Sequence, residues 1–128
     1  MDIVYFRGTK FDRKMLKIQT LIEKLEAQLH TGEMDKVLPS YAFGSDLMSD
    51  VLTLDNQEIL LITGLSNSQT IRTAEMADIE IVIVARGKDI TPEMKSLASE
   101  HDITLLSSPY SLFKICGILY QTGLKPLY

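Results

Sequence analysis

The sequence is poor in the residues that build cross-links and metal centres. Its 128 residues include a single cysteine, Cys116, so no disulfide can form within the chain. The two histidines, His30 and His101, lie far apart in the sequence and lack the neighbouring ligands of a zinc site. We therefore expect a fold that depends on its hydrophobic core, with no metal and no cofactor.

Long apolar runs and basic stretches are also missing. No apolar run approaches the roughly 18 residues that a membrane-spanning helix needs, and the first residues lack the pattern of a signal peptide. The formal net charge is −4 at pH 7, without the basic stripe that nucleic-acid binding usually requires. We expect a cytoplasmic protein that binds neither nucleic acid nor a membrane.

The sequence does contain enough apolar material for one core. Hydrophobic residues make up 45% of the chain and charged residues 23%, which is typical of a globular domain of this length. We assign residues 15–124 to one α/β domain, 1–14 to an N-terminal extension or arm, and 125–128 to a C-terminal tail. Two interpretations of residues 1–14 are about equally good: an extra strand or N-terminal arm, or an extension that precedes a natural start at Met15.

Three strand–helix units can be recognised between about Glu58 and Gly123. Three apolar runs are typical of strands buried on both faces: 58–63, 79–85 and 103–106. Each precedes a helical pattern, and we expect helices at 68–77, from the Thr91-Pro92 cap to His101, and from the Ser108-Pro109 cap to Gly123. Strands that alternate with helices across short loops predict a parallel sheet.

The first half of the chain is less regular. A helix begins near Leu16 and ends either near Leu25, leaving a short strand at 27–31, or near Leu29. A strand is expected at 41–43, followed by a short helix whose cap is Ser45 or Asp46. The predicted fold is a single three-layer α/β domain with a small, mostly parallel sheet flanked by helices.

Two loops at the expected carboxyl ends of the strands are the candidate ligand site. Exposed N–H groups, a helix dipole and nearby cations suit an anion such as a nucleotide or a phosphate metabolite. Neither loop matches a GxGxxG or Walker motif. The alternative interpretation is structural, with polar side chains capping a helix and glycines permitting tight turns. The candidate ligand-binding residues are Gly64, Ser66, Asn67, Gln69, Arg72, Arg86 and Gly87.

The sequence contains no convincing catalytic set. Asp46 and Asp50 would share a helix face, as paired carboxylates in acid–base or cation sites do, but a cap and solvation explain them. Cys116 lies in an apolar segment without a basic partner to activate it. We therefore expect no catalytic residues and no enzymatic activity.

The last helix is apolar nearly all round. A helix with almost no polar face is buried on more than one side, and in a small chain the second cover can be another subunit. Burial within the monomer and formation of a homodimer both fit this pattern. The residues of the candidate dimer interface are Leu112, Phe113, Cys116, Leu119 and Tyr120.

Several segments, in the same order along the chain, resemble the DRTGG domain family. They lie between about Leu16 and Gly123 and comprise Ser45-Asp46-Leu47-Met48-Ser49-Asp50-Val51-Leu52, residues 61–69, residues 71–76 and residues 103–113. The sequence departs from the family name, with Ser66-Asn67-Ser68-Gln69 where many members carry Asp-Arg, and Ala85-Arg86-Gly87 where Thr-Gly-Gly is commoner.

The resemblance implies a regulatory role. DRTGG domains accompany CBS domains in regulated pyrophosphatases, and their fold is similar to the N-terminal domains of HPr kinase/phosphorylase and of Mur ligases. They often self-associate, and no catalytic residues are assigned to them. The leading hypothesis is a non-catalytic module that homodimerises and acts through a regulated enzyme or a CBS- or kinase-type partner. The alternative is a small-ligand sensor that binds a nucleotide or phosphate metabolite at the loop 64–69.

Overall fold

The computed structural model describes residues 3–6, 9–12, 16–54 and 58–128, with side chains from 16–54 and 58–128. Met15 and the turn expected at Asp55-Asn56 lie outside the described residues. The elements follow in the order β1 (Ile3–Phe6), β2 (Thr9–Asp12), α1 (Ile18–Leu25), β3 (Gln28–Thr31), β4 (Tyr41–Gly44), α2 (Met48–Val51), β5 (Ile59–Thr63), α3 (Ser68–Met76), β6 (Ile81–Val84), α4 (Pro92–Glu100), β7 (Thr104–Ser107), α5 (Leu112–Thr122) and β8 (Lys125–Pro126).

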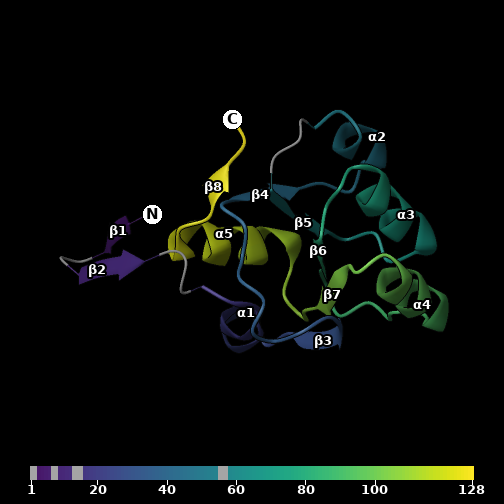
Figure 1. The fold of residues 1–128 in the computed structure, drawn as a ribbon, viewed down its shortest axis with the longest axis horizontal. Coiled ribbons are helices and arrows are strands. Elements are labelled where there is room, and N and C mark those ends of the chain that lie inside the picture. Colours follow the sequence, from purple (N-terminus) through teal and green to yellow (C-terminus); the bar gives the residue numbers. More distant parts are fainter. Residues whose placement is uncertain (1–2, 7–8, 13–15, 55–57) are drawn as a thin grey trace.

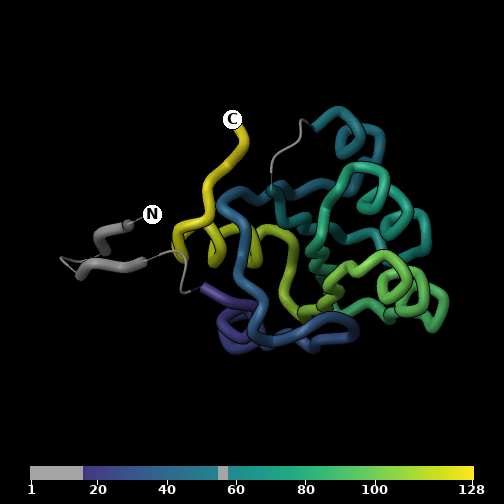
Figure 2. Tube along the Cα trace, viewed as in Figure 1, coloured from purple at the N-terminus to yellow at the C-terminus, as the bar shows by residue number. Residues whose placement is uncertain are grey.

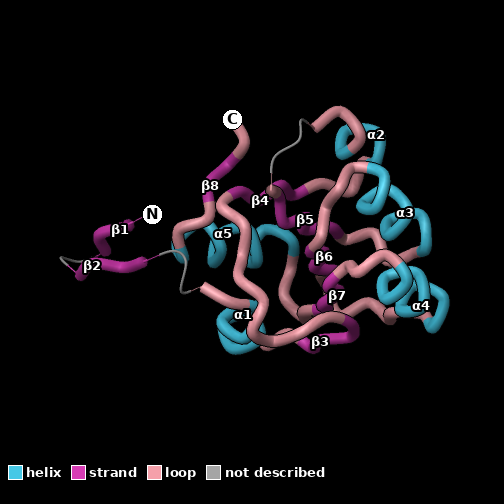
Figure 3. The backbone as a smooth tube through the Cα atoms, in the orientation of Figure 1, coloured by secondary structure: helices cyan, strands magenta, loops and turns pink. Residues whose placement is uncertain are grey.

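Six strands form one sheet in the order β3-β7-β6-β5-β4-β8 (Figures 1 and 3). The four central strands and β8 are parallel, and only the edge strand β3 runs antiparallel to its neighbour β7. β1 and β2 pair separately as two antiparallel strands. The predicted mostly parallel α/β sheet is confirmed.

Helices cover both faces of the six-stranded sheet. Figure 1 shows α2, α3 and α4 on one side and α1 and α5 on the other. Alternate strand residues follow this division, because Leu60 and Ile62 pack with α1 and α5 while Leu61 and Val82 pack towards α2, α3 and α4. The three-layer arrangement is therefore confirmed.

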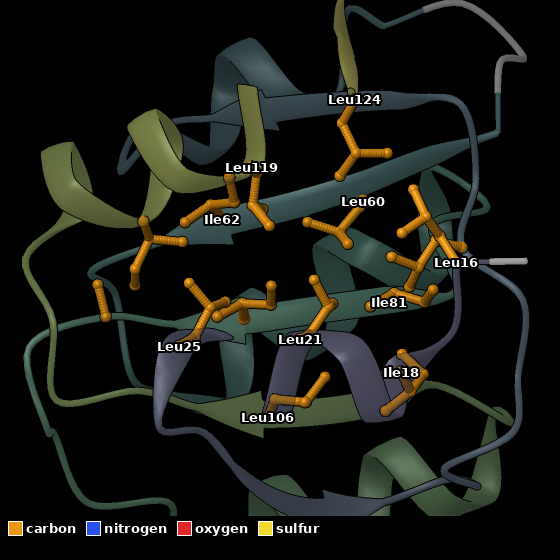
Figure 4. Packing of buried hydrophobic residues seen from close by; sticks show 14 residues of the cluster. Leu16, Ile18, Leu21, Leu25, Leu60, Ile62, Ile81, Leu106, Leu119 and Leu124 are labelled. Atoms are coloured by element: carbon orange, nitrogen blue, oxygen red, sulfur yellow. The ribbon is translucent and has the colours of Figure 1, made fainter. Parts of the chain in front are cut away.

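The core beneath α1 and α5 shows why the first helix forms where it does. Its apolar residues recur at helical spacing, and Ile18, Leu21 and Leu25 are fully buried against β5, β6 and β7 (Figure 4). The helix ends at Glu26, whose φ of +50° is left-handed, and β3 follows at once. Of the two predicted ends, the one near Leu25 is correct.

The end of the chain adds a strand that the sequence did not predict. In Figure 2 the yellow C-terminal segment returns to the sheet beside β4, where Tyr41 pairs with Lys125 and Ala42 with Pro126. Proline suits this position because an edge strand leaves one row of backbone groups unpaired. Residues 125–126 therefore extend the sheet.

Two predicted helix caps are wrong. The cap of α5 is Ser111, whose Oγ accepts from Lys114 N at 3.2 Å, whereas Ser108 is buried and its hydroxyl donates to the Leu25 carbonyl. α2 has Leu47 at its cap position with no side-chain cap bond.

Among the described helices, none is long and apolar enough to cross a membrane.

Candidate functional site

The carboxyl ends of β4, β5, β6 and β7 lie along one edge of the sheet, and Asp46 organises its centre. Asp46 follows β4, and its Oδ1 accepts hydrogen bonds from Gly64 N at 2.5 Å and from Thr63 Oγ1 at 3.2 Å. Thr63 Oγ1 in turn accepts from Leu65 N at 3.1 Å. The carboxylate of Asp46, which was predicted to cap a helix, therefore joins the loop after β4 to the loop after β5 by hydrogen bonds.

The loop after β6 is fastened to both of its neighbours. Lys88 Nζ donates to the Gly64 carbonyl, and Ser66 Oγ donates to the Asp89 carbonyl. On the other side, Arg86 N donates to the Tyr110 carbonyl and Gly87 N to the Ser108 carbonyl, both at 2.8 Å. These bonds hold the β5, β6 and β7 loops together at their bases.

Two glycines at this edge of the sheet are needed for backbone geometry or for close packing. Gly87 has a φ of +63°, which favours glycine at this turn. Gly64 is buried, and a Cβ built there would lie 3.1 Å from Arg86 Nη2 and 3.1 Å from Asp46 Oδ2. Gly64 is thus a point of close approach between the Asp46 carboxylate and the Arg86 guanidinium.

The residues predicted to hold an anion are brought to one edge, but several have internal partners. The N–H groups of Gly64 and Gly87 are bound within the protein, and Asn67 Oδ1 caps α3 by accepting from Thr70 N at 3.1 Å. Arg72 Nη2 lies 3.6 Å from Glu93 Oε1 on α4. Arg86 is exposed and, among the described residues, has no ion-pair partner within 4 Å.

The outer face of α5 is the second candidate site. Phe113 is 89% exposed and Tyr120 is 68% exposed, which is unusual for aromatic side chains of this size. Leu112 is half-buried, whereas Leu119 is 1% exposed and packs in the core beside the sheet. Leu119 therefore belongs to the interior of the monomer, and the prediction that it lies at a subunit interface is corrected.

Gly117 lies at the centre of this outer face. The exposed positions of α5 lie three or four residues before or after it, at Phe113, Lys114, Tyr120 and Gln121. A Cβ built on Gly117 would meet no atom within 4 Å outside its own helix backbone, so packing in the monomer gives no reason for glycine here. We call Phe113, Gly117 and Tyr120 the α5 outer face.

Cys116 and the two histidines take structural positions. Cys116 is half-buried beside Gly44, where a Cβ would come within 2.9 Å of its Sγ, and burial raises the pKa of its thiol. His30 Nε2 lies 2.7 Å from Ser107 Oγ, and His101 is the exposed C-cap residue of α4. Within the described residues, no group of three or more potential His, Cys, Asp or Glu ligands is suited to a metal.

Comparison with known proteins shows a likeness of fold. No family model and no curated protein matches the sequence. The fold is similar to that of the CBS and DRTGG domains of the regulatory region of Clostridium perfringens pyrophosphatase, a structure complexed with the activator diadenosine tetraphosphate. The TM-score is 0.71 at 19% sequence identity, over 89% of this chain. The chain spans about half of that structure's chain, 52%, and the likeness supports a DRTGG-like fold.

Proposed function

We propose that the protein is a non-catalytic, DRTGG-type regulatory module that self-associates through the α5 outer face and acts on a partner protein in the cytoplasm. The single observation that carries the proposal is the exposure of Phe113 and Tyr120 on either side of a bare Gly117. The fold likeness to a pyrophosphatase regulatory region supports the regulatory part.

The α5 outer face is suited to a second copy of itself. Phe113 lies four residues before Gly117 and Tyr120 three residues after it. Two α5 helices that cross antiparallel at Gly117, about a twofold axis, place Phe113 of one copy near Tyr120 of the other, and the reverse. Glycine at the crossing lets the two backbones approach closely, and the aromatic side chains leave water together.

Removal of Phe113 tests self-association. Burial of a large apolar side chain contributes about 1.5–3 kcal/mol, and a symmetric dimer contains two copies, so Phe113→Ala should weaken dimerisation by about 3–6 kcal/mol. The corresponding increase in the dissociation constant is roughly 10²- to 10⁴-fold, measured by sedimentation velocity over a dilution series.

Met76→Ala is the matched control. Met76 is 64% exposed but lies in α3, on the other side of the sheet, so its removal should leave the dissociation constant unchanged. Equal effects of Phe113→Ala and Met76→Ala would contradict an interface at α5. A wild-type protein that stays monomeric at hundreds of micromolar would contradict self-association altogether.

The alternative of an anion sensor at the loop 64–69 receives less support from the geometry. Asp46 and Asn67 already bind N–H groups of this loop and of α3, and Glu93 lies beside Arg72. Arg86 is the one predicted cation without an ion pair among the described residues, and its guanidinium lies beside Gly64. A small-ligand site is better supported one strand further along this edge.

A further inference from the structure

A crevice of about 420 Å³ opens between the loop after β6 and the end of β7. Its walls come from three parts of the chain: Gly87 and Lys88 after β6, Ser107 at the end of β7, and Glu26 and His30 around the start of β3. The volume falls within the range of about 300–1,000 Å³ that small-molecule sites occupy. It lies outside the predicted loop 64–69 and apart from the α5 outer face.

The topology of the sheet places this crevice where parallel α/β sheets commonly bind ligands. After β6 the chain turns to α4 on one face, and after the adjacent β7 it turns to α5 on the other face (Figure 1). Loops that leave neighbouring strands towards opposite faces diverge and open a crevice between them. Gly87 N and Ser108 O, bonded at 2.8 Å, close the floor.

The polar groups that line the crevice are mostly hydrogen-bond acceptors or neutral groups. Glu26 and Asp89 supply two carboxylates, and Lys88 supplies one ammonium that already donates to the Gly64 carbonyl. His30 lies 2.7 Å from Ser107 Oγ, and burial, together with the charge of Lys95, lowers its pKa. Its imidazole is therefore neutral at pH 7 and both donates and accepts hydrogen bonds.

The position of Glu26 is fixed by the fold. It is the left-handed C-cap residue of α1, with a φ of +50°, and its N–H donates to the Ile22 carbonyl. Burial, followed by the charge of the nearby Glu26 carboxylate, raises the pKa of the Tyr110 hydroxyl. Glu26 therefore lines the crevice from a backbone position that is set by the end of α1.

The crevice lacks the excess of cations that a polyanion needs. Glu26, Asp89 and Lys88 line it, and the charge of Lys95 reaches His30, so the charges around it nearly balance and give a triphosphate no electrostatic advantage over a nucleoside. A ligand with several hydroxyl donors instead finds carboxylate, imidazole and serine acceptors. In dinucleotide-binding folds a carboxylate at the carboxyl edge of a parallel sheet accepts from the ribose hydroxyls, and Glu26, which precedes the antiparallel strand β3, lies at that edge.

We propose that the crevice between the β6 and β7 loops binds a nucleoside or its monophosphate, with Glu26 accepting from the ribose hydroxyls and with Ser107 and His30 completing the polar wall. Ile90 and Pro109 supply the apolar surface for the base. The site is independent of the proposed dimer, because no residue of the α5 outer face lines it.

Titration of the full chain tests the proposal. Adenosine, guanosine, cytidine and uridine, with their mono- and triphosphates, are added while amide chemical shifts are recorded by NMR. At least one nucleoside or monophosphate should shift the amides of Gly87 to Ile90 and Ser107, and the corresponding triphosphate should bind no more tightly.

Two variants locate the site. Glu26→Gln removes the charged acceptor and should weaken binding by about tenfold or more, whereas Glu23→Gln, an exposed position of the same helix, should leave it unchanged. Binding of no probe at millimolar concentration, tighter binding of the triphosphate, or equal affinity of Glu26→Gln and the wild type would each overturn the proposal. None of these results depends on the mass of the protein in solution, so they test the ligand site independently of the proposed dimer.

Discussion

Replacement of Gly117 by alanine should change the stability of the monomer and the strength of the dimer in opposite directions. Gly117 lies in the middle of α5, where alanine is the better helix former by about 0.8–1.0 kcal/mol. A Cβ at this position meets no atom within 4 Å outside the helix backbone. The monomer should therefore gain up to about 1 kcal/mol in its free energy of unfolding.

The dimer should lose affinity through the same methyl group. If two α5 helices cross at Gly117, each added methyl group enters the closest contact between the backbones. Overpacking of a tight contact costs about 1–3 kcal/mol, which corresponds to roughly a 5- to 150-fold increase in the dissociation constant. The same substitution thus stabilises the fold and weakens the assembly.

Two measurements separate these effects. Sedimentation velocity over a dilution series gives the dissociation constant of Gly117→Ala and of the wild type. Urea unfolding in a Phe113→Glu background, which removes the aromatic contact and adds like charges across the twofold axis, gives the stability of the monomer. An unchanged or tighter dimer would refute the crossing at Gly117, and a destabilised monomer would refute the view that the monomer leaves this face free.

Three further predictions concern the carboxyl edge, the crevice wall and the thiol. Asp46→Ala leaves the buried Thr63 hydroxyl and the Gly64 N–H without their acceptor, so the free energy of unfolding in urea should fall by about 1–3 kcal/mol. Asp46→Asn keeps an acceptor oxygen and should lose less stability. Equal stability of the wild type and the alanine variant would contradict this role of Asp46. The pKa of His30 is lower in the folded state than its unfolded value near 6.5, so the unfolded chain binds more protons as the pH falls through this range. The unfolding midpoint should therefore fall more steeply from pH 7.5 to 5.5 in the wild type than in His30→Gln. Parallel curves would contradict the lowered pKa of His30. Burial raises the Cys116 pKa, so iodoacetamide should alkylate the native thiol at pH 8 more slowly than the urea-unfolded one, and equal rates would show that the thiol is free.

The regular half of the fold could be predicted because its signals are local. Every residue of β5 and β6 is buried, and each of these strands is a continuous apolar run in the sequence. Thr91 and Pro92 begin α4 as predicted, with Thr91 Oγ1 accepting from Met94 N at 3.1 Å. Burial on both faces and a helix start each leave a pattern that needs no knowledge of distant residues.

What the sequence could not predict depends on contacts between distant residues. β8 is two residues long and has no apolar pattern, so only its pairing with β4 defines it. Ser108 and Ser111 are equally good caps by residue type, and the distant Leu25 carbonyl decides between them by binding the first. Asp46 bonds to a backbone group 18 residues later, which no local cap signal indicates.

The sequence could not decide between two interpretations of α5 for a related reason. The apolar composition left burial within the monomer and cover by a second subunit both open, and in the structure Ile115 and Leu119 are buried while Phe113 and Tyr120 are exposed. Composition alone does not distinguish an interior helix from one with a second apolar surface. The distinction required the positions of the sheet and of α1.

The most direct test of self-association through α5 is the mass of the purified wild-type protein in solution, measured beside Phe113→Glu over the same concentrations. The monomer has a mass of 14.4 kDa. Self-association through α5 predicts a wild-type species of twice that mass that dissociates on dilution, and a Phe113→Glu variant that remains a folded monomer throughout. A wild-type monomer at every concentration, or a Phe113→Glu variant that dimerises as tightly as the wild type, would contradict it.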